Sequence, residues 1–585
     1  MTESAVLQLL TATLTEQLKF IYGDERASPL CERVVELMGF DANTTAPRPF
    51  TNHWDESDVW LISYGDSIQT GQDKPLRTLK HFLDHRLREE ISAVHILPFY
   101  PYSSDDGFSV INYVEVNPSL GDWQDVEALG EHFKLMADCV INHCSSRSLW
   151  FDNFKKGEGV GHDYFFEASP DDDLSAVVRP RTSPLLRPTE TAAGLKHVWC
   201  TFSHDQVDLN FANPAVLIEF ARILRFYLDC GIRVFRLDAV AFLWKEEGSP
   251  SLNLPQTHEI VRLLRTLIEH VDTTAILITE TNIPNRENLS YFGNSNEAHM
   301  VYNFSLPPLL LHSLWSGDCH YLKNWLMSMP PAQFGTTYFN FLASHDGIGL
   351  RPAEGLLDDA EIDALVRTAE AFGGQVSWRA LEHGARKPYE LNIALFDALQ
   401  GTHNGKDGYN IERFICAHAI MLALEGIPAL YIHSLIGTHN DLPRVTATGH
   451  ARAINRHQWD AEQLEQALAD PASEHHQVFE RLKALIRLRK AQPAFHPNAL
   501  QFTLHLSDAI FGFRRHSLDR TQNIFVLNNI TDQPQTIPLT ELNLMLQHDW
   551  FDLISGQTYD SLTESLSLAP YQSVWISNRR GNIDR

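Results

Sequence analysis

Long hydrophobic runs are missing from this chain of 585 residues. Apolar stretches such as ILPFYP and LPPLLL fall far short of the ~20 residues that a membrane-spanning helix needs. The N-terminal stretch MTESAVLQLLTATLTEQLKF also lacks the basic segment and small-residue cleavage site of a secretory signal. These absences predict a cytoplasmic protein that is neither exported nor bound in a membrane.

Positive charge is also scarce, because the formal net charge is −27. Nucleic acids and anionic membranes are bound by clustered lysine and arginine, so neither is an expected partner. The contents of hydrophobic residues (44%) and charged residues (21%) are ordinary for a soluble globular protein. We therefore expect small-molecule ligands and a monomer or homodimer.

Cysteine pairs with metal-binding spacing are absent as well. None of the seven cysteines belongs to a CxxC pair, and the spacing of Cys139 and Cys144 suits zinc poorly. No acidic loop with EF-hand spacing is present either. We therefore expect reduced, mostly buried thiols and neither a metal nor a cofactor.

The chain does contain a repeating order of strand-like runs and helices. Residues 1–55 have helical apolar spacing and predict an N-terminal helical extension. From residue 56, short apolar runs recur, most of them followed by an amphipathic helix. Eight such runs predict an α/β fold, a closed parallel (β/α)8 TIM barrel over residues 56–500. The runs cover residues 59–66, 93–101, 134–143, 232–240, 275–281, 299–304, 337–346 and 427–434.

Two long segments interrupt this rhythm. One spans about residues 145–205 (domain B) and the other about residues 350–415 (domain B′). In a barrel, such insertions emerge at the C-terminal ends of the strands, where active sites lie. After residue 500, alternating runs such as NIFVLNN and SVWIS predict a small antiparallel β domain over residues 501–585.

Three acidic residues end predicted barrel strands. Asp238 ends FRLD, Glu280 ends LITE and Asp346 ends LASHD. A single aspartate at such a place is often only a helix cap. Three carboxylates at one barrel mouth, together with His143, Arg236 and His345, instead favour an acid/base site.

These blocks carry a family resemblance. DCVINH, FRLDAV, ITETN and ASHD resemble the four short motifs of the α-amylase family, glycoside hydrolase family 13. HILPFYPYSSDDGF, FSLPPLLLH, SHDGIGL and ARAINRH are similar to its sucrose phosphorylase branch. HWDESDV, RPRTSPLL, ITETN and PYELNI look most like the glucosylglycerate phosphorylases of that branch.

The resemblance implies a retaining mechanism. Asp238 would be the nucleophile that forms a β-glucosyl-enzyme, and Glu280 would be the acid and then the base. Asp346 would hold sugar hydroxyls and stabilise the transition state. Such a mechanism needs an ionised nucleophile roughly 5 Å from a protonated acid. Arg236, two residues before the nucleophile, is expected to keep it charged through a bidentate contact.

The resemblance also implies residues that bind the glucose. Asp106 and Arg456 are expected to form a pair that closes over its far side. Asp106 could instead be a turn residue, since DDG is a turn signal, and Phe108 could belong to the core rather than face the sugar. The expected sugar contacts are Asp106, Phe108, His143, Phe202, Gln206, Arg236, His345 and Arg456.

An arginine-bearing loop, AVVRPRTSPLLRP (residues 176–188), lies in the first insertion. A phosphorylase must bring a phosphate dianion close to several carboxylates, and a rigid arginine suits that task. By resemblance, Arg181 would contact phosphate, with Tyr389 beside it. Alternatively, these arginines neutralise the acidic run Asp171–Asp173, which we expect of Arg179 and Arg187.

The second substrate is less well specified. The chain has Phe242 and Asn282 where sucrose phosphorylases have tyrosine and histidine, which speaks against fructose. Asn282 could instead meet an anionic acceptor such as glycerate. Arg386 and Lys387 could do the same, or these two basic residues could be solvated. Asn142 is the position at which many α-amylases bind calcium, but the phosphorylase branch generally does without that ion.

The hypothesis is therefore a cofactor-free phosphorylase that converts glucosylglycerate and phosphate to α-glucose 1-phosphate and glycerate. Sucrose, sucrose 6′-phosphate or glucosylglycerol are alternative substrates. A hydrolase or transglucosidase without phosphate, and a non-catalytic barrel, are further alternatives. Retention of all three carboxylates speaks against the last of these.

Overall fold

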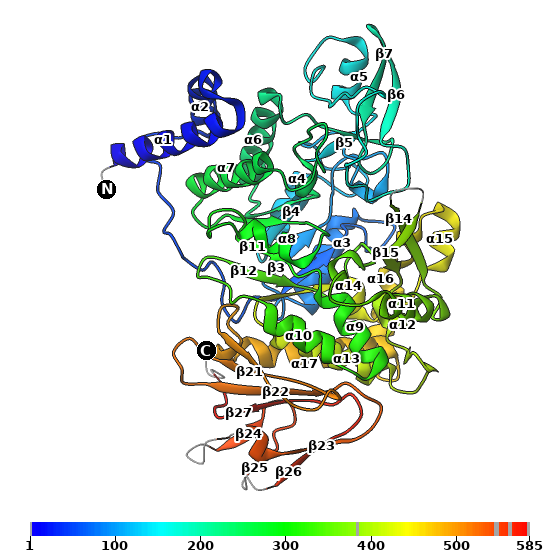
Figure 1. Ribbon diagram of the computed structural model, residues 1–585. Helices are drawn as coiled ribbons and strands as arrows, with labels where there is room; N and C mark the ends of the chain where they lie inside the picture. The colour runs from blue at the N-terminus through cyan, green and yellow to red at the C-terminus, as the bar shows by residue number, and fades with distance from the viewer. Residues whose placement is uncertain (1–2, 382–384, 543, 545–548, 560–563, 582–585) are drawn as a thin grey trace.

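A computed structural model describes residues 3–381, 385–542, 544, 549–559 and 564–581. Each of the eight predicted runs contributes one strand to a closed parallel barrel, in the order β1-β18-β12-β11-β10-β9-β4-β3. Figure 1 labels β3, β4, β11 and β12 of this barrel. The predicted barrel is thereby confirmed. Its strands are β1 Trp60–Ser63, β3 Ala93–Ile96, β4 Lys134–Cys139, β9 Val234–Leu237, β10 Ile276–Thr279, β11 Met300–Tyr302, β12 Thr337–Asn340 and β18 Ile427–Tyr431.

Strand register sets the level of the barrel mouth. Leu237, the last residue of β9, pairs with Cys139 at the end of β4 and with Thr279 at the end of β10. The residues that follow β9 and β10 therefore leave the sheet at the same height. Asp238 and Glu280 are those residues, so the register alone brings the two carboxylates together.

Helices alternate with the barrel strands along the chain. Several begin with proline in their first turn, where its missing N–H has no helical partner to lose. The helices between or after barrel strands are α3 Pro75–Arg86, α4 Trp123–Gly130, α6 Pro214–Asp229, α7 Pro255–Val271, α8 Asn285–Leu289, α9 Leu306–Ser316, α10 His320–Ser328, α13 Asn410–Ala423, α14 Ile432–Ile436, α15 Leu442–Thr448, α16 Ala461–Ala469 and α17 Glu474–Lys490. In the described part of the chain, none of the helices has the length and apolarity to cross a bilayer.

The first insertion lies at the upper end of the molecule in Figure 1 and contains helix α5 (Leu149–Lys156) and the hairpin β6–β7 (Leu186–Thr191, Gly194–Trp199). Its return strand β8 (Gln206–Asp208) pairs with β5 (His143–Ser145), directly after barrel strand β4. Next to β8, Asp205 accepts hydrogen bonds from the hydroxyls of four serines. These are Ser103, Ser104, Ser109 and Ser146. The insertion is thereby fastened to the loop after β3.

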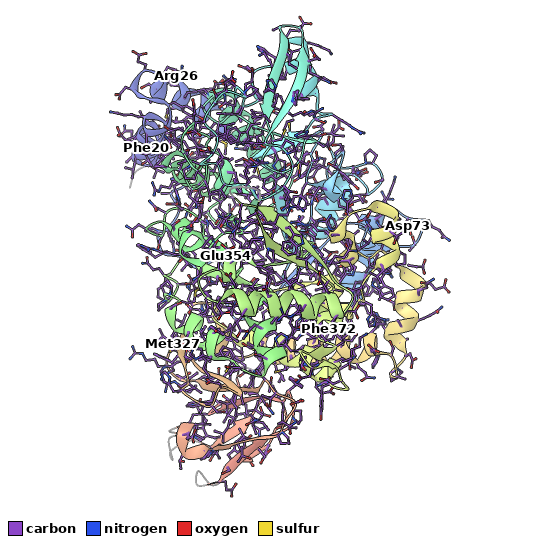
Figure 2. All side chains as sticks on the ribbon, turned by 45° about the vertical axis from the view of Figure 1, so that its right-hand side comes forward. Phe20, Arg26, Asp73, Met327, Glu354 and Phe372 are labelled. Carbon is purple, nitrogen blue, oxygen red and sulfur yellow. The ribbon has the colours of Figure 1, made fainter. Side chains whose placement is uncertain are left out.

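The second insertion carries a three-stranded sheet of β13 (Ile348–Gly349), β15 (Arg386–Asn392) and β14 (Gln375–Ala380). In the chain, helix α11 (Asp359–Ala371) lies between β13 and β14, between Glu354 and Phe372, which Figure 2 labels. The short helix α12 (Leu395–Ala398) follows the sheet. Residues 410–415, at the end of the predicted insertion, belong to barrel helix α13.

The ends of the chain flank the barrel. Helices α1 (Glu3–Tyr22) and α2 (Asp24–Met38) lie within residues 1–55 and pack on α7 and α6 respectively. At the other end, a six-stranded antiparallel sheet has the order β20-β21-β22-β27-β24-β25, and β23 pairs with β26 (Figure 1). Its strands are β20 Leu500–Thr503, β21 Ile510–His516, β22 Asn523–Asn529, β23 Gln535–Pro538, β24 Trp550–Asp552, β25 Thr558–Tyr559, β26 Ser565–Leu568 and β27 Ser573–Ser577. The exact domain limits stay predictions.

Candidate active site

A pocket opens at the C-terminal ends of the barrel strands, between the two insertions. Eleven of the fifteen predicted site residues line it; Asp106, Arg236, Arg386 and Arg456 do not. The lining comprises Asp105, Phe108, His143, Arg181, Phe202, Gln206, Asp238, Ala239, Ala241, Phe242, Glu280, Thr281, Asn282, Ile283, His345, Asp346, Tyr389 and Arg452. The structure therefore brings all three predicted catalytic carboxylates to one pocket.

Arg236 lies below Asp238 and is almost completely buried. Its Nη1 donates to Asp238 Oδ1 at 2.7 Å and also to Asp138, a buried residue of β4. The contact with Asp238 is therefore single rather than bidentate as predicted, because the guanidinium is shared with a second carboxylate. Burial raises the pKa of Asp238, and the charge of Arg236 opposes the rise.

Glu280 is held next to Asp238 by the backbone. Its Oε2 accepts a hydrogen bond of 3.0 Å from the N–H of Ala239, the residue after Asp238. Ala239 has a left-handed conformation with φ of 50°, which is unusual for a non-glycine residue. Burial raises the pKa of Glu280 to about 7, and the charges of Asp238 and Asp346 act in the same direction. Glu280 thus has the pKa of a group that can donate and accept a proton near neutral pH.

Asp346 does not end its strand, contrary to prediction. Strand β12 ends at Asn340, because the chain turns away into a loop before it reaches SHD. Asp346 reaches the same pocket from this loop, and its Oδ1 lies 2.5 Å from Nη1 of Arg452. Burial alone would raise the pKa of Asp346, but the charge of Arg452 outweighs it and holds this pKa well below its usual range.

Aromatic and amide groups form the wall opposite. The rings of Phe108 and His345 stack at 4.7 Å with 5° between their planes. Phe108 lines the pocket as well as packing against its neighbours. Nε2 of His143 lies 2.9 Å from the carbonyl oxygen of Phe108, and Nε2 of Gln206 donates to that oxygen at 3.1 Å. Phe202 packs beside His143, with 5.2 Å between ring centres.

Asp106 and Arg456 form the predicted pair, with 2.7 Å between Asp106 Oδ2 and Nη1 of Arg456. Both lie behind the pocket wall, and Asp105 occupies the lining position instead. The cause is the turn Asp105–Gly107, in which both aspartates have positive φ, so the second points away from the pocket. The turn interpretation and the pairing interpretation of Asp106 therefore both hold.

Arg181 lies on the side of the pocket formed by the insertions. Its guanidinium carbon is 5.2 Å from the ring centre of Tyr389 and 5.7 Å from that of Phe202. Its side chain donates to the carbonyl of Pro180 at 3.3 Å, and no carboxylate pairs with it among the described residues. Nearby, Asn282 Nδ2 lies 3.4 Å from the Tyr389 hydroxyl, and the buried Oδ1 of Asn282 has no hydrogen-bond partner there.

The other basic residues lie elsewhere. Arg386 is exposed on β15 and does not line the pocket, and Lys387 pairs with Asp359 at 3.3 Å. The prediction that Arg386 meets an anionic acceptor is therefore wrong, because β15 leaves this side chain exposed outside the pocket. Arg179 and Arg187 donate to backbone carbonyls of Ser183 and His204 rather than neutralising the acidic run Asp171–Asp173.

Asn142 adjoins a cation supplied by the chain itself. Nζ of Lys245, a buried residue, donates to Asn142 Oδ1 at 3.0 Å and lies 3.1 Å from Asp208 Oδ2. It also donates to the carbonyl oxygen of Phe242 at 2.9 Å. An ammonium group thus sits among these oxygens.

All seven cysteines are free, as expected, and only Cys230 is not fully buried.

Several residues of the site were not identified from the sequence. Asp138, Asp105 and Arg452 stand inside motifs that were recognised, namely DCVINH, DDGF and ARAINRH. Glu390 follows Tyr389 in PYELNI and binds Arg452. Their place as charged residues within recognised motifs is the signal from which these site residues could have been identified.

Comparison with known proteins agrees with this geometry. Residues 86–348 match the catalytic domain of α-amylase. A glucosylglycerate phosphorylase from Allomeiothermus silvanus is 42% identical over 98% of this chain and 100% of its own length. One from Escherichia coli is 41% identical over 96% of this chain and 99% of its own length.

More distant relatives include a sucrose phosphorylase from Agrobacterium vitis, 30% identical over 75% of this chain and 89% of its own length. The crystal structure of sucrose 6F-phosphate phosphorylase from Thermoanaerobacter thermosaccharolyticum superposes with a TM-score of 0.70 at 25% identity, covering 81% of this chain and 94% of that one. The chain belongs to the α-amylase family, in the sucrose phosphorylase branch that these relatives represent.

Proposed function

We propose that the protein is a retaining phosphorylase that converts glucosylglycerate and phosphate to α-glucose 1-phosphate and glycerate. The observation that carries the phosphate step is Arg181, a guanidinium beside the three-carboxylate pocket without a carboxylate partner in the described structure. Without a free guanidinium, a phosphate dianion that enters this pocket would be repelled by the carboxylates there. The choice of glycerate rests on the relatives named glucosylglycerate phosphorylase.

The reaction proceeds in two displacements. An Asp238 oxygen attacks the anomeric carbon, the bond from that carbon to the glycerate oxygen breaks, and Glu280 gives its proton to that oxygen. A phosphate oxygen then attacks the same carbon, the bond to Asp238 breaks, and Glu280 takes the phosphate proton. Two inversions retain the α configuration.

The acceptor side offers groups that suit glycerate. Arg181 can pair with its carboxylate, and the unpartnered Oδ1 of Asn282 can accept a hydrogen bond from a hydroxyl. Arg386 is left out of this assignment because it is exposed outside the pocket. A cytoplasmic location and a monomeric or homodimeric state remain predictions from the sequence.

The acceptor is tested by incubating the protein with α-glucose 1-phosphate and one of glycerate, glycerol, fructose or fructose 6-phosphate. Phosphate release is measured, with an Asp238→Asn variant and an acceptor-free sample as controls. Release with glycerate well above the other three is the expected result. Preference for another acceptor would change the substrate assignment, and release independent of any acceptor would indicate a hydrolase.

A further inference from the structure

Arg452 joins two carboxylates that come from different loops. It lies in the turn Ala451–Asn455, after barrel strand β18, and its Nη1 is 2.5 Å from Asp346 Oδ1. Its Nε and Nη2 donate to the two oxygens of Glu390 at 3.0 and 2.7 Å. The guanidinium therefore uses one edge for Glu390 in a bidentate pair and leaves one nitrogen for Asp346.

Glu390 is the deeper of the two carboxylates. Its residue is only 1% exposed, whereas Arg452 and Asp346 both line the pocket. A side chain at Gly347, the residue after Asp346, would come within 2.5 Å of Glu390 Cγ. Gly347 thus allows Glu390 to lie directly against the Asp346 loop. Glu390 does not line the pocket but pairs with Arg452, which does, so its contact with that arginine is an anchor.

The arginine changes what Asp346 can do. A buried carboxylate without a cation tends to take up a proton, and burial alone would do this to Asp346. Among the groups that oppose burial and lower the pKa of Asp346, Arg452 has the largest effect. An ionised carboxylate with a fixed oxygen leaves its second oxygen free to accept hydrogen bonds from sugar hydroxyls.

We propose that Arg452, anchored by Glu390, is a positioning residue that keeps Asp346 ionised and oriented toward the glucosyl group. The inference rests on the proposed glucosyl transfer. Because Glu390 follows Tyr389 on β15, one strand of the second insertion serves both sides of the pocket. Its tyrosine faces Arg181, and its glutamate fixes the cation behind Asp346.

The test measures fluoride release from α-glucosyl fluoride as a function of pH. Fluoride leaves without a proton from Glu280, and the readout does not depend on the natural acceptor. Six titratable or charged groups face the Arg452–Asp346 pair. Each variant replaces one residue and leaves all the other groups as they are in the parent protein. These groups are Asp105, Arg236, Glu280, His345, Glu390 and Arg456.

Three variants separate charge from anchoring. Arg452→Gln removes the cation and should lower kcat/KM by about 10- to 100-fold. It should also move the acid limb of the profile to higher pH, since Asp346 then takes up a proton more readily. Arg452→Lys should restore the position of the limb but only part of the rate. Glu390→Gln keeps the cation and should lower kcat without moving the limb upward.

An acid limb that is the same in Arg452→Gln and in the parent protein would overturn the proposal. If Arg452→Gln does not fold, unchanged kcat and KM in Glu390→Gln would overturn it equally. Circular dichroism of each variant identifies folding defects. If the parent releases fluoride but glycerate gives no phosphate release, the acceptor assignment fails and this inference is still tested.

Discussion

Arg181 lies with its guanidinium carbon 5.2 Å from the ring centre of Tyr389, so the two insertions meet through a cation and an aromatic face. The first insertion supplies the charge and the second supplies the surface that holds it. Such a contact fixes the guanidinium without neutralising its charge. A carboxylate partner would fix the guanidinium as well but would neutralise it. The hydrogen-bonding edge of the arginine is thereby available for an anion.

Arg181→Ala should therefore raise the KM for phosphate by roughly 10- to 100-fold, the worth of charge-assisted hydrogen bonds. Slow hydrolysis of α-glucosyl fluoride, which needs no phosphate, should change far less. Steady-state kinetics at varied phosphate concentration measure the first effect, and fluoride release without phosphate measures the second. Arg187, six residues further on in β6, supplies the matched control, because its Nη1 donates to the backbone carbonyl of His204 at 2.5 Å. Arg181→Lys should weaken phosphate binding, whereas Arg187→Lys should not. Equal phosphate KM values in these two variants would contradict the assignment.

The pKa of Glu280, about 7, predicts how the rate depends on pH. Glucosylation from glucosylglycerate needs the protonated acid, so kcat/KM should fall as pH rises through about 7. With α-glucosyl fluoride this basic limb should disappear, because fluoride needs no proton to leave. Glu280→Gln should keep the first, single-turnover release of fluoride and lose glucosylglycerate cleavage. A basic limb that persists with the fluoride donor in Glu280→Gln would assign the titration to another group.

The barrel could be predicted because each of its strands is a short apolar run ending in polar residues. Asp238 and Glu280 followed from this, since each comes directly after its strand. Which of Asp105 and Asp106 lines the pocket could not be predicted, because it depends on backbone angles within one turn. The Arg452–Glu390 pair joins residues 62 positions apart, and no local pattern encodes such a contact. Arg386 was misjudged because its positive charge suits an anionic acceptor but does not fix which way the side chain points from β15.

Asp238→Asn should abolish turnover, with a loss of at least about 10⁴-fold, since the covalent intermediate cannot form. The amide has nearly the same shape and can still contact Arg236, which Asp138 keeps paired in any case. The thermal unfolding midpoint should therefore change little. Incubating the parent protein with a slowly released donor and measuring intact mass should reveal one added glucosyl group, absent from the variant. Substantial activity in the variant would remove Asp238 from the role of nucleophile.

Lys245 gives a prediction about stability rather than chemistry. Its ammonium is buried among Asn142, Asp208 and the carbonyl of Phe242. It therefore joins the segment between β4 and β5, the return strand of the first insertion and the turn after Asp238. Lys245→Met keeps the volume but leaves Asp208 as a buried carboxylate without its cation, which costs about 3–5 kcal/mol. The thermal unfolding midpoint should fall accordingly. A second change, Asp208→Asn, should recover part of the loss, because it removes the uncompensated charge. Purely additive losses in the double variant would show that the ion pair does not hold these segments together, since a coupled pair must deviate from additivity.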